Sequence, residues 1–235
     1  MKVTPVHTPV FKEGESLPQF IATQISVVKE KTIVVVSSKL TGLWKKCTVP
    51  YKNAAQKEKL IVQESQAALK TQLAWLTIKN GMVMTNSGID ESNANGKLIL
   101  LPKDCYAVAE ELRVALKTLW NVQNLGIIIT DSMILPLRAG VIGAAVGYAG
   151  FKGVKDLRGH KDLCGRKLKT TLVNLADALA TTATVLMGEA DEQSPLCVIE
   201  NAPVKFVEKT DPTELKYPPE DDLYAPLLKA VKLIQ

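Results

Sequence analysis

Two uninterrupted apolar runs constrain the fold of this chain more than any other feature of its 235 residues. They are "KTIVVVSSK" (Lys31–Lys39) and "LGIIITDS" (Leu125–Ser132), and both are rich in the β-branched residues Val and Ile. Short continuous runs of this kind are typical of strands that are buried on both faces. Both end in polar residues, so we expect buried strands that deliver hydroxyl, amine and carboxylate groups at their ends.

Helical and strand patterns occupy the chain around these two runs. Apolar periodicity predicts helices over 53–76 and 104–120, with Asp104 as the N-cap of the second. A third helix is predicted within 167–191, and Gly188 is its expected stop. Further strands are expected in "GMVMTNSGID" and "PLCVIE".

A glycine-rich segment, "AGVIGAAVGYAGFKG" (139–153), follows the second apolar run. It does not match Gly-x-Gly-x-x-Gly, and no strand with an acidic residue follows at the spacing of a dinucleotide-binding unit. A Rossmann fold is therefore disfavoured. The glycines predict either close packing of the backbone or a loop that lets a ligand approach.

Composition and charge exclude several classes of protein. Hydrophobic residues make up 46% of the chain and charged residues 23%, which is ordinary for a globular protein and argues against disorder. The 29 basic and 24 acidic residues give a net charge of +5, which suits an anionic ligand such as a nucleotide. No basic run is interleaved with aromatic residues, so we expect no nucleic-acid partner.

The cysteines and the apolar segments indicate the compartment. The four cysteines show no Cys-x-x-Cys spacing, which predicts reduced thiols in a cytoplasmic protein. The start of the chain, "MKVTPVHTPVFKEGE", lacks the apolar core of a secretory signal. The most membrane-like stretch, Ala139–Phe151, is shorter than the ~20 apolar residues that a spanning helix needs. We therefore expect no membrane association.

One spacing could suggest zinc. Cys164 lies four residues after His160, which would place both side chains on one face of a helix. Gly159 and Gly165 bracket this stretch and favour a loop, so we expect no zinc site there.

The segment "TNSGIDESN" (85–93) joins a Gly, two carboxylates, hydroxyls and amides between two apolar stretches. A turn alone would explain Gly88, Asp90 and Asn93. The segment also follows a predicted strand, as does the pair Asp131 and Ser132, and the ends of strands are where α/β proteins place functional groups.

Asp90, Asp131 and Ser132 form a set of oxygen ligands that suits a hard divalent cation. Mg²⁺ or Mn²⁺ bound to a nucleotide needs one or two carboxylates and a hydroxyl, and phosphate and water supply the rest. The alternative is that Asp131 and Ser132 cap a helix that follows the strand.

Six segments together resemble the coenzyme F-420 γ-glutamyl ligase family, in the same order and from about His7 to Val204. They are "SGIDESN", "LLPKD", "IITDS", "PLRAG", "DLRGHKDLCGRKL" and "ADALATTATVLMGEAD". Within the family, "LPLRAGVIGAAVGYAG" is more similar to bacterial members described as folate γ-glutamate ligases than to archaeal enzymes that act on the deazaflavin. No single segment is specific, but their ordered combination is.

The resemblance implies an α+β fold with mixed sheets and flanking helices, not a Rossmann fold. It implies a catalytic region over residues 1–204, with room for two subdomains, and a C-terminal tail over 205–235 with a short helix. It also implies a homodimer that uses GTP and a divalent metal, Mg²⁺ or Mn²⁺ and two ions in all, to add L-glutamate to a carboxylate of a small molecule.

Site residues follow from the resemblance by position. Asp90, Asp131 and Ser132 match the metal ligands, with Ser132 where Thr is usual. Asp90 and Asp131, together with Arg138, are the expected catalytic residues. One departure concerns Leu43, which stands where the family commonly has a lysine that reaches the nucleotide, and the choice between GTP and ATP therefore stays open. The expected nucleotide contacts are Thr8, Pro9, Val10, Phe11, Ser38 and Asn93.

The implied mechanism is activation of the acceptor carboxylate as an acyl phosphate, which the amine of glutamate then displaces. Arg138, Arg158 or Lys39 could hold phosphate or an incoming carboxylate, or could form ordinary ion pairs. Two other functions stay open. The chain could be a catalytically silent homologue that binds a nucleotide or a pterin, as Leu43 suggests, or a metal-dependent phosphohydrolase.

Overall fold

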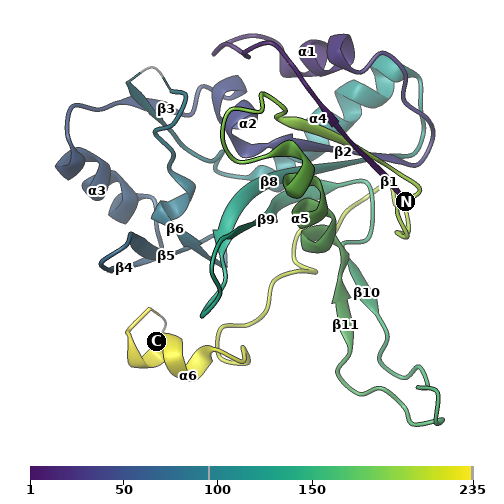
Figure 1. Ribbon diagram of the computed structural model, residues 1–235. Coiled ribbons are helices and arrows are strands. Elements are labelled where there is room, and N and C mark those ends of the chain that lie inside the picture. The colour runs from purple at the N-terminus through teal and green to yellow at the C-terminus, as the bar shows by residue number, and fades with distance from the viewer. Residues whose placement is uncertain (95, 234–235) are drawn as a thin grey trace.

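The structure is a computed structural model that describes residues 1–94 and 96–233. It is a mixed α+β fold, as expected, in which a five-stranded sheet carries helices on both faces and a smaller unit of short strands and one helix lies at its side (Figure 1). The helices are α1 (Leu17–Gln24), α2 (Ser38–Trp44), α3 (Ala54–Gln63), α4 (Cys105–Trp120), α5 (Leu175–Met187), α6 (Ala225–Ala230) and the 3-10 turn η1 (Asn86–Gly88).

The main sheet has the strand order β1-β12-β2-β8-β9. Only β2 and β8 run parallel among these neighbours, and the other pairs are antiparallel. The strands of the main sheet are β1 (Lys2–Val6), β2 (Thr32–Ser37), β8 (Leu125–Ile134), β9 (Val141–Ala149) and β12 (Leu196–Glu200).

The two apolar runs are the central strands of this sheet, which confirms the prediction that they are buried on both faces. Val34 and Val36 of β2 pack with α1 and α4, whereas Ile33 and Val35 pack with α5 on the opposite face. Side chains alternate between the faces of a strand, so a continuous Val/Ile run is what two helical layers require.

Strand β8 differs from the sequence prediction at its end. It continues past Asp131 and Ser132 to Ile134, and a register shift between Ile129 and Thr130 marks a bulge in its pairing with β9. The chain then returns directly as β9, so the alternative that Asp131 and Ser132 cap a helix is wrong.

The glycine-rich segment forms β9, which lies between α4 and α5. A β-carbon at Gly143 would overlap Thr184 of α5, and one at Gly147 would overlap the backbone of Cys105 in α4. Close backbone packing is therefore the reason for these two glycines.

Local capping explains where the helices begin. Asp104 caps α4 as predicted, accepting a hydrogen bond from the backbone N–H of Ala107 at 2.9 Å. Asn174 caps α5, which therefore begins at Leu175, and α5 ends at Met187 with Gly188 as its C-cap, as expected. The predicted helix over 53–76 is wrong beyond residue 63, because the chain turns there into paired strands.

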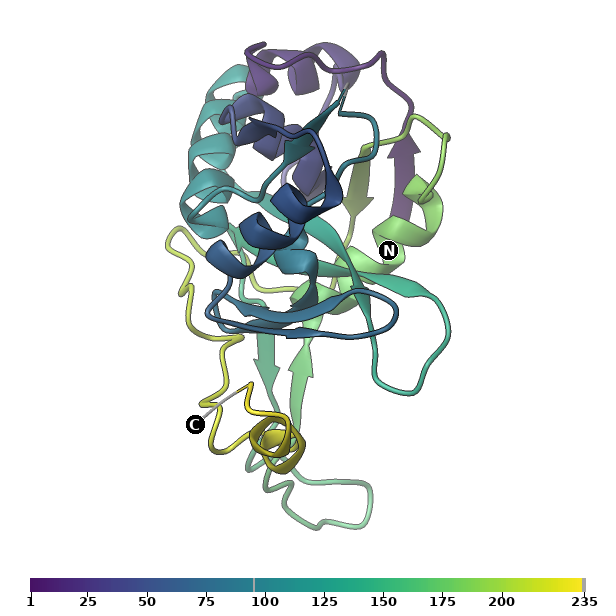
Figure 2. The same ribbon diagram turned by 90° about the vertical axis from the view of Figure 1, so that its left-hand side faces the viewer.

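The remaining strands lie outside the main sheet. A three-stranded sheet and a two-stranded ladder belong to the smaller unit with α3, and the β10–β11 pair forms an arm that projects from the body together with its loop over 157–171 (Figure 2). These strands are β3 (Thr48–Pro50), β4 (Ala67–Lys70), β5 (Trp75–Lys79), β6 (Met82–Thr85), β7 (Lys97–Ile99), β10 (Val154–Asp156) and β11 (Leu172–Asn174).

The described part of the tail, from residue 205 to 233, is tied to the body before it reaches α6. The Glu214 carboxylate accepts hydrogen bonds from the Tyr148 hydroxyl and from the backbone N–H of Gly153, both at 2.6 Å. Glu208 pairs with the buried Arg113 of α4 at 2.7 Å. Among the described helices, none is both long enough and apolar enough to cross a bilayer.

Candidate active site

A cleft of about 610 Å³ lies where four segments of the chain converge. These segments are the N-terminal stretch 8–11, the start of α2, the loop over 90–93 and the loop over 188–195 that follows α5. The end of β8 completes the wall. The cleft is lined by eight of the ten residues expected at the site, which are Thr8, Pro9, Val10, Phe11, Asp90, Asn93, Asp131 and Ser132.

Asp131 is positioned by the parallel pairing of the two central strands. Ser37, the last residue of β2, pairs with Thr130 of β8, so Ser38 at the start of α2 lies next to Asp131. The Ser38 hydroxyl donates a hydrogen bond to Asp131 Oδ1 at 3.0 Å. Ser38 does not itself line the cleft; its contact with the site runs through Asp131.

The carboxyl group of Asp131 is in an unfavourable environment for a charge. Burial and, to a smaller extent, the nearby charge of Asp90 raise the pKa of Asp131 to about 6, although the hydrogen bond from Ser38 acts in the opposite direction. The loop before Asp90 lies close to the Asp131 carboxylate: a β-carbon at Gly88 would be 3.2 Å from Asp131 Oδ2. Gly88 also has a φ of 66°, which favours glycine.

Asp90 is held on both of its carboxylate oxygens. Oδ1 accepts the backbone N–H of Ser92 at 2.7 Å, and Oδ2 lies 2.9 Å from the Lys39 ammonium. Burial raises the pKa of Asp90, but the hydrogen bonds and the charge of Lys39 outweigh it and hold that pKa below its usual value. The segment 85–93 is thus both a turn and part of the cleft wall.

Ser132 makes a contact that sequence reasoning did not identify. Its hydroxyl donates to Glu189 Oε2 at 2.8 Å, and Glu189 lines the cleft together with Asp191 and Glu192. The three acids follow the helix stop at Gly188, so the acidic run "GEADE" was the available signal. Because neighbours on a strand point to opposite faces, Asp131 reaches α2 while Ser132 reaches the loop after α5.

The charges of the cleft are unbalanced. Lys39 is the one basic side chain of its described lining. The same lining includes five carboxylates, those of Asp90, Asp131, Glu189, Asp191 and Glu192. Carboxylate and hydroxyl oxygens are the donors that Mg²⁺ and Mn²⁺ prefer, so Asp90, Asp131 and Ser132 fit such an ion. In the described part of the chain, no three His, Cys, Asp or Glu side chains are grouped closely enough to hold a metal by themselves.

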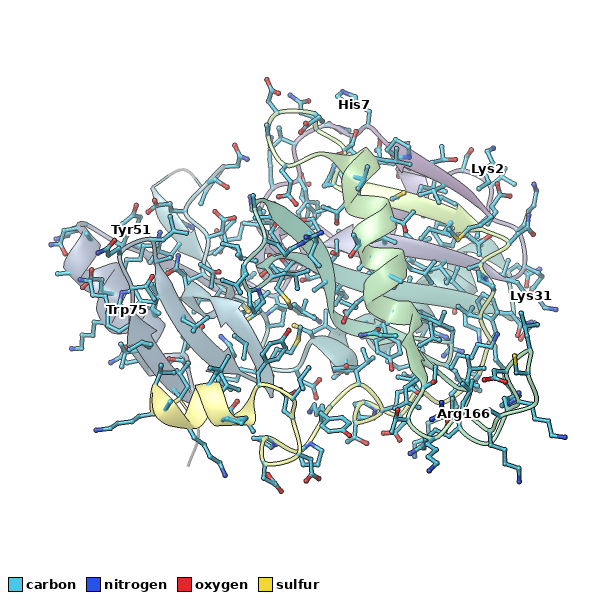
Figure 3. All side chains as sticks on the ribbon, turned by 60° about the horizontal axis from the view of Figure 1, so that its bottom comes forward. Lys2, His7, Lys31, Tyr51, Trp75 and Arg166 are labelled. Atoms are coloured by element: carbon cyan, nitrogen blue, oxygen red, sulfur yellow. The ribbon has the colours of Figure 1, made fainter. Side chains whose placement is uncertain are left out.

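Two of the arginines considered from the sequence lie elsewhere. Arg138 is exposed in the turn between β8 and β9 and does not line the cleft. Arg158 is on the arm, where its guanidinium pairs with Asp156 at 2.6 Å. The arm also carries His160 and the exposed Cys164 in a loop, as their flanking glycines predicted (Figure 3 labels Arg166 in the same loop).

Leu43 is one of the apolar residues of the cleft wall. The two lysines that follow it do not replace a basic group there. Lys45 pairs with Glu111 of α4, and neither Lys45 nor Lys46 lines the cleft.

The fold and the cleft define an α+β protein with an acidic, oxygen-rich site at the ends of two parallel strands, a site suited to a cation and an anionic ligand. The sequence model described as F420-0:Gamma-glutamyl ligase matches residues 5–201. The chain therefore belongs to the F420-0:gamma-glutamyl ligase family.

Similar proteins carry the name coenzyme F420:L-glutamate ligase. The protein of Methanocaldococcus jannaschii is 34% identical over 95% of this chain and 96% of its own length. That of Archaeoglobus fulgidus is 34% identical over 85% of this chain and 87% of its own. The match to Methanococcus maripaludis strain C6 is 46% identical, but it covers only 62% of this chain and 58% of the relative.

Proposed function

We propose that this chain is a nucleotide- and metal-dependent ligase that adds L-glutamate through an amide bond to a coenzyme F420 precursor. The observation that carries the proposal is the convergence of Asp90, Asp131 and Ser132 on one cleft in a member of this family. The names of the relatives favour the deazaflavin over a folate-like acceptor.

In this proposal Asp90, Asp131 and Ser132 hold the divalent cations, two Mg²⁺ or Mn²⁺ ions. When bound, such ions neutralise charge on the phosphate oxygens of a nucleotide. The apolar and hydroxyl side chains of segment 8–11 line the other wall of the cleft, together with Asn93, and would contact GTP. Ser38 would act by fixing the Asp131 carboxylate.

The reaction proceeds in two steps, and the cleft has to orient the reactants in each. A carboxylate oxygen of the acceptor attacks the γ-phosphorus of GTP, and the bond to GDP breaks. The amine of glutamate then attacks the acyl carbon, phosphate leaves, and the amine loses a proton to give the amide. Both steps depend on positioning and charge neutralisation rather than on a catalytic histidine.

We also propose that the chain works as a homodimer. Two projecting segments support this proposal, because Leu137 at the β8–β9 turn and Leu163 on the arm are fully exposed. Arg138 lies beside Leu137 and outside the cleft of its own chain, so in a dimer it would be available to the second copy.

The direct test is incubation of the purified protein with the F420 precursor, L-glutamate, GTP and Mg²⁺ or Mn²⁺, followed by mass spectrometry. The expected product is heavier by one glutamate residue, it depends on both nucleotide and metal, and it is absent for Asp131→Asn. Replacing GTP by ATP ranks the two nucleotides.

Phosphate release separates the alternative functions in the same assay. A ligase releases phosphate only when glutamate and the acceptor are present, whereas a phosphohydrolase releases it without them. A protein that binds nucleotide and releases no phosphate under any condition would be the silent homologue that Leu43 suggested. The same assay with a folate acceptor in place of the deazaflavin tests which of the two acceptors receives the glutamate.

A further inference from the structure

Lys39 makes contacts that a ligand in this cleft would have to change. Its ammonium lies 2.9 Å from Asp90 Oδ2 and 2.6 Å from the Ser92 hydroxyl. The side chains of Lys39 and Asp90 are 31% and 38% exposed, so this ion pair is at the cleft surface and can open without disturbing the core. Lys39 thus occupies the position of a counterion for Asp90.

The ion pair and a metal ion compete for the same carboxylate. Oδ1 of Asp90 already accepts the Ser92 backbone N–H, and Oδ2 faces Lys39. If Asp90 bound a divalent cation, Oδ2 would be the oxygen left for it, and the added charge would repel the Lys39 ammonium. An exposed ion pair is weak enough to be displaced by a doubly charged ion.

A phosphate that enters the cleft finds its basic partner in Lys39. The described lining contains no other basic side chain, and its five carboxylates offer no site for an anion. A nucleotide phosphate would arrive with the cation, and the flexible four-carbon stem of lysine allows the ammonium to turn toward it.

We infer that Lys39 exchanges partners when ligands bind, from Asp90 before binding to a phosphate oxygen of the bound nucleotide. This inference rests on the proposed function, and it gives Lys39 two opposite effects. Before nucleotide arrives, Lys39 competes with the metal ion for Asp90. Once nucleotide is bound, Lys39 stabilises the complex.

The test compares the wild-type chain with Lys39→Met in two binding titrations. In the first, Mn²⁺ alone is titrated and free Mn²⁺ is followed by electron paramagnetic resonance. Loss of the competing ammonium should tighten Mn²⁺ binding by about two- to fivefold. In the second, a non-hydrolysable GTP analogue is titrated in saturating Mn²⁺, and its affinity should fall by about tenfold or more.

Two further variants serve as controls. Lys45→Met removes a lysine of the same segment that pairs with Glu111 outside the cleft, and it should change neither titration. Lys39→Arg keeps the charge and should stay close to wild type for Mn²⁺. Circular dichroism melting of the ligand-free proteins reports whether each variant is folded.

The outcomes separate the exchange from the proposed function. Opposite changes in the two titrations support the exchange. Weaker binding of Mn²⁺ alone in Lys39→Met, or unchanged binding in both titrations, overturns the exchange. The proposed function still stands in that case if the wild type binds Mn²⁺ and nucleotide together. A wild type that does not bind the two together overturns both.

Discussion

The carboxyl group of Asp131 lies where burial and charge act against each other. Its pKa is raised to about 6. The folded protein is therefore less stable at neutral pH, where this carboxyl group is charged, than it would be without the charge. An amide of the same shape would fit this position without a buried charge. A carboxyl group that lowers the stability of the fold is therefore a strong candidate for a functional residue.

Asp131→Asn should therefore separate binding from stability. We expect the ligand-free variant to melt at the same temperature as the wild type or above it, since the buried charge is gone. Joint addition of GTP and Mg²⁺ at about 100 times the dissociation constant should stabilise the wild type by about 2.7 kcal/mol and leave the variant unchanged. A thermal-shift series measures both effects.

The matched control for this series is Asp221→Asn, a carboxylate of the tail that does not line the cleft. It should keep the full stabilisation by the two ligands. An Asp131→Asn protein that is stabilised like the wild type would remove Asp131 from the metal site.

The sequence predicted some residues of the site and not others, for physical reasons. Asp90, Asp131 and Ser132 could be placed together because each follows an apolar run of the sequence, and functional groups gather where such runs end. Glu189 could not be found this way, since its contact with Ser132 spans 57 residues and depends on how the loop after α5 closes. Arg138 was assigned from its motif alone, and motifs carry no information on where an exposed turn projects.

Elements were predictable where a single pattern covered them. The Val/Ile runs defined β2 and β8, and the Asp104 cap defined the start of α4. The region after residue 63 failed because its apolar spacing fits both a helix and the short antiparallel strands β4 and β5. The long helix predicted within 167–191 failed at its start because residues 172–174 pair with β10 in the arm.

Strand β9 gives a prediction at this scale. Gly147→Ala would push a β-carbon into the backbone of Cys105, which cannot move without shifting α4. We expect a loss of about 1–3 kcal/mol in the free energy of unfolding, as for other overpacked sites. Urea unfolding followed by circular dichroism measures it.

Val141→Ala on the same strand is the comparison for Gly147→Ala, because residue Val141 is 47% exposed. Its effect should stay within about 0.5 kcal/mol. Equal midpoints for Gly147→Ala and the wild type would show that α4 and β9 are not packed as tightly as the structure indicates.

At the scale of the whole molecule, the tail contributes to the stability of the body. Glu208 pairs with Arg113 at 2.7 Å and with Lys117 at 3.1 Å. The hydrogen bonds from Lys117 and then from Arg113 hold the pKa of Glu208 below its usual value. A lowered carboxyl pKa adds stability above about pH 4.5, the unfolded value, and this contribution is lost as the pH falls through the folded value.

Glu208→Gln should therefore be less stable than the wild type at pH 7 and approach it as the pH falls below about 4.5. The difference at neutral pH should stay near 1 kcal/mol or less, because Glu208 is largely exposed and solvent screens the pair. Urea midpoints measured between pH 3 and 8 test this. A difference that grows toward acid would contradict the assigned pKa direction.

A second whole-molecule prediction concerns shortened chains. A chain that ends at residue 204 loses Glu208, Thr210 and Glu214, which bond Arg113, Gly150 and Tyr148. A chain that ends at residue 216 keeps all three contacts. We expect the longer fragment to show a cooperative urea transition and the shorter one to lose it or shift it strongly to lower urea. Equal transitions would show that these contacts are dispensable.

The tie between the tail and Arg113 separates two boundaries that are easily treated as one. The family model ends at residue 201, yet the guanidinium of Arg113, which is only 1% exposed, pairs with Glu208 beyond that point as well as with Glu110 of its own helix. The segment that the family model covers is thus shorter than the segment whose side chains reach a buried residue of the body. The tail therefore supplies one of two acids for a buried arginine, and a chain without Glu208 still has Glu110 beside that charge.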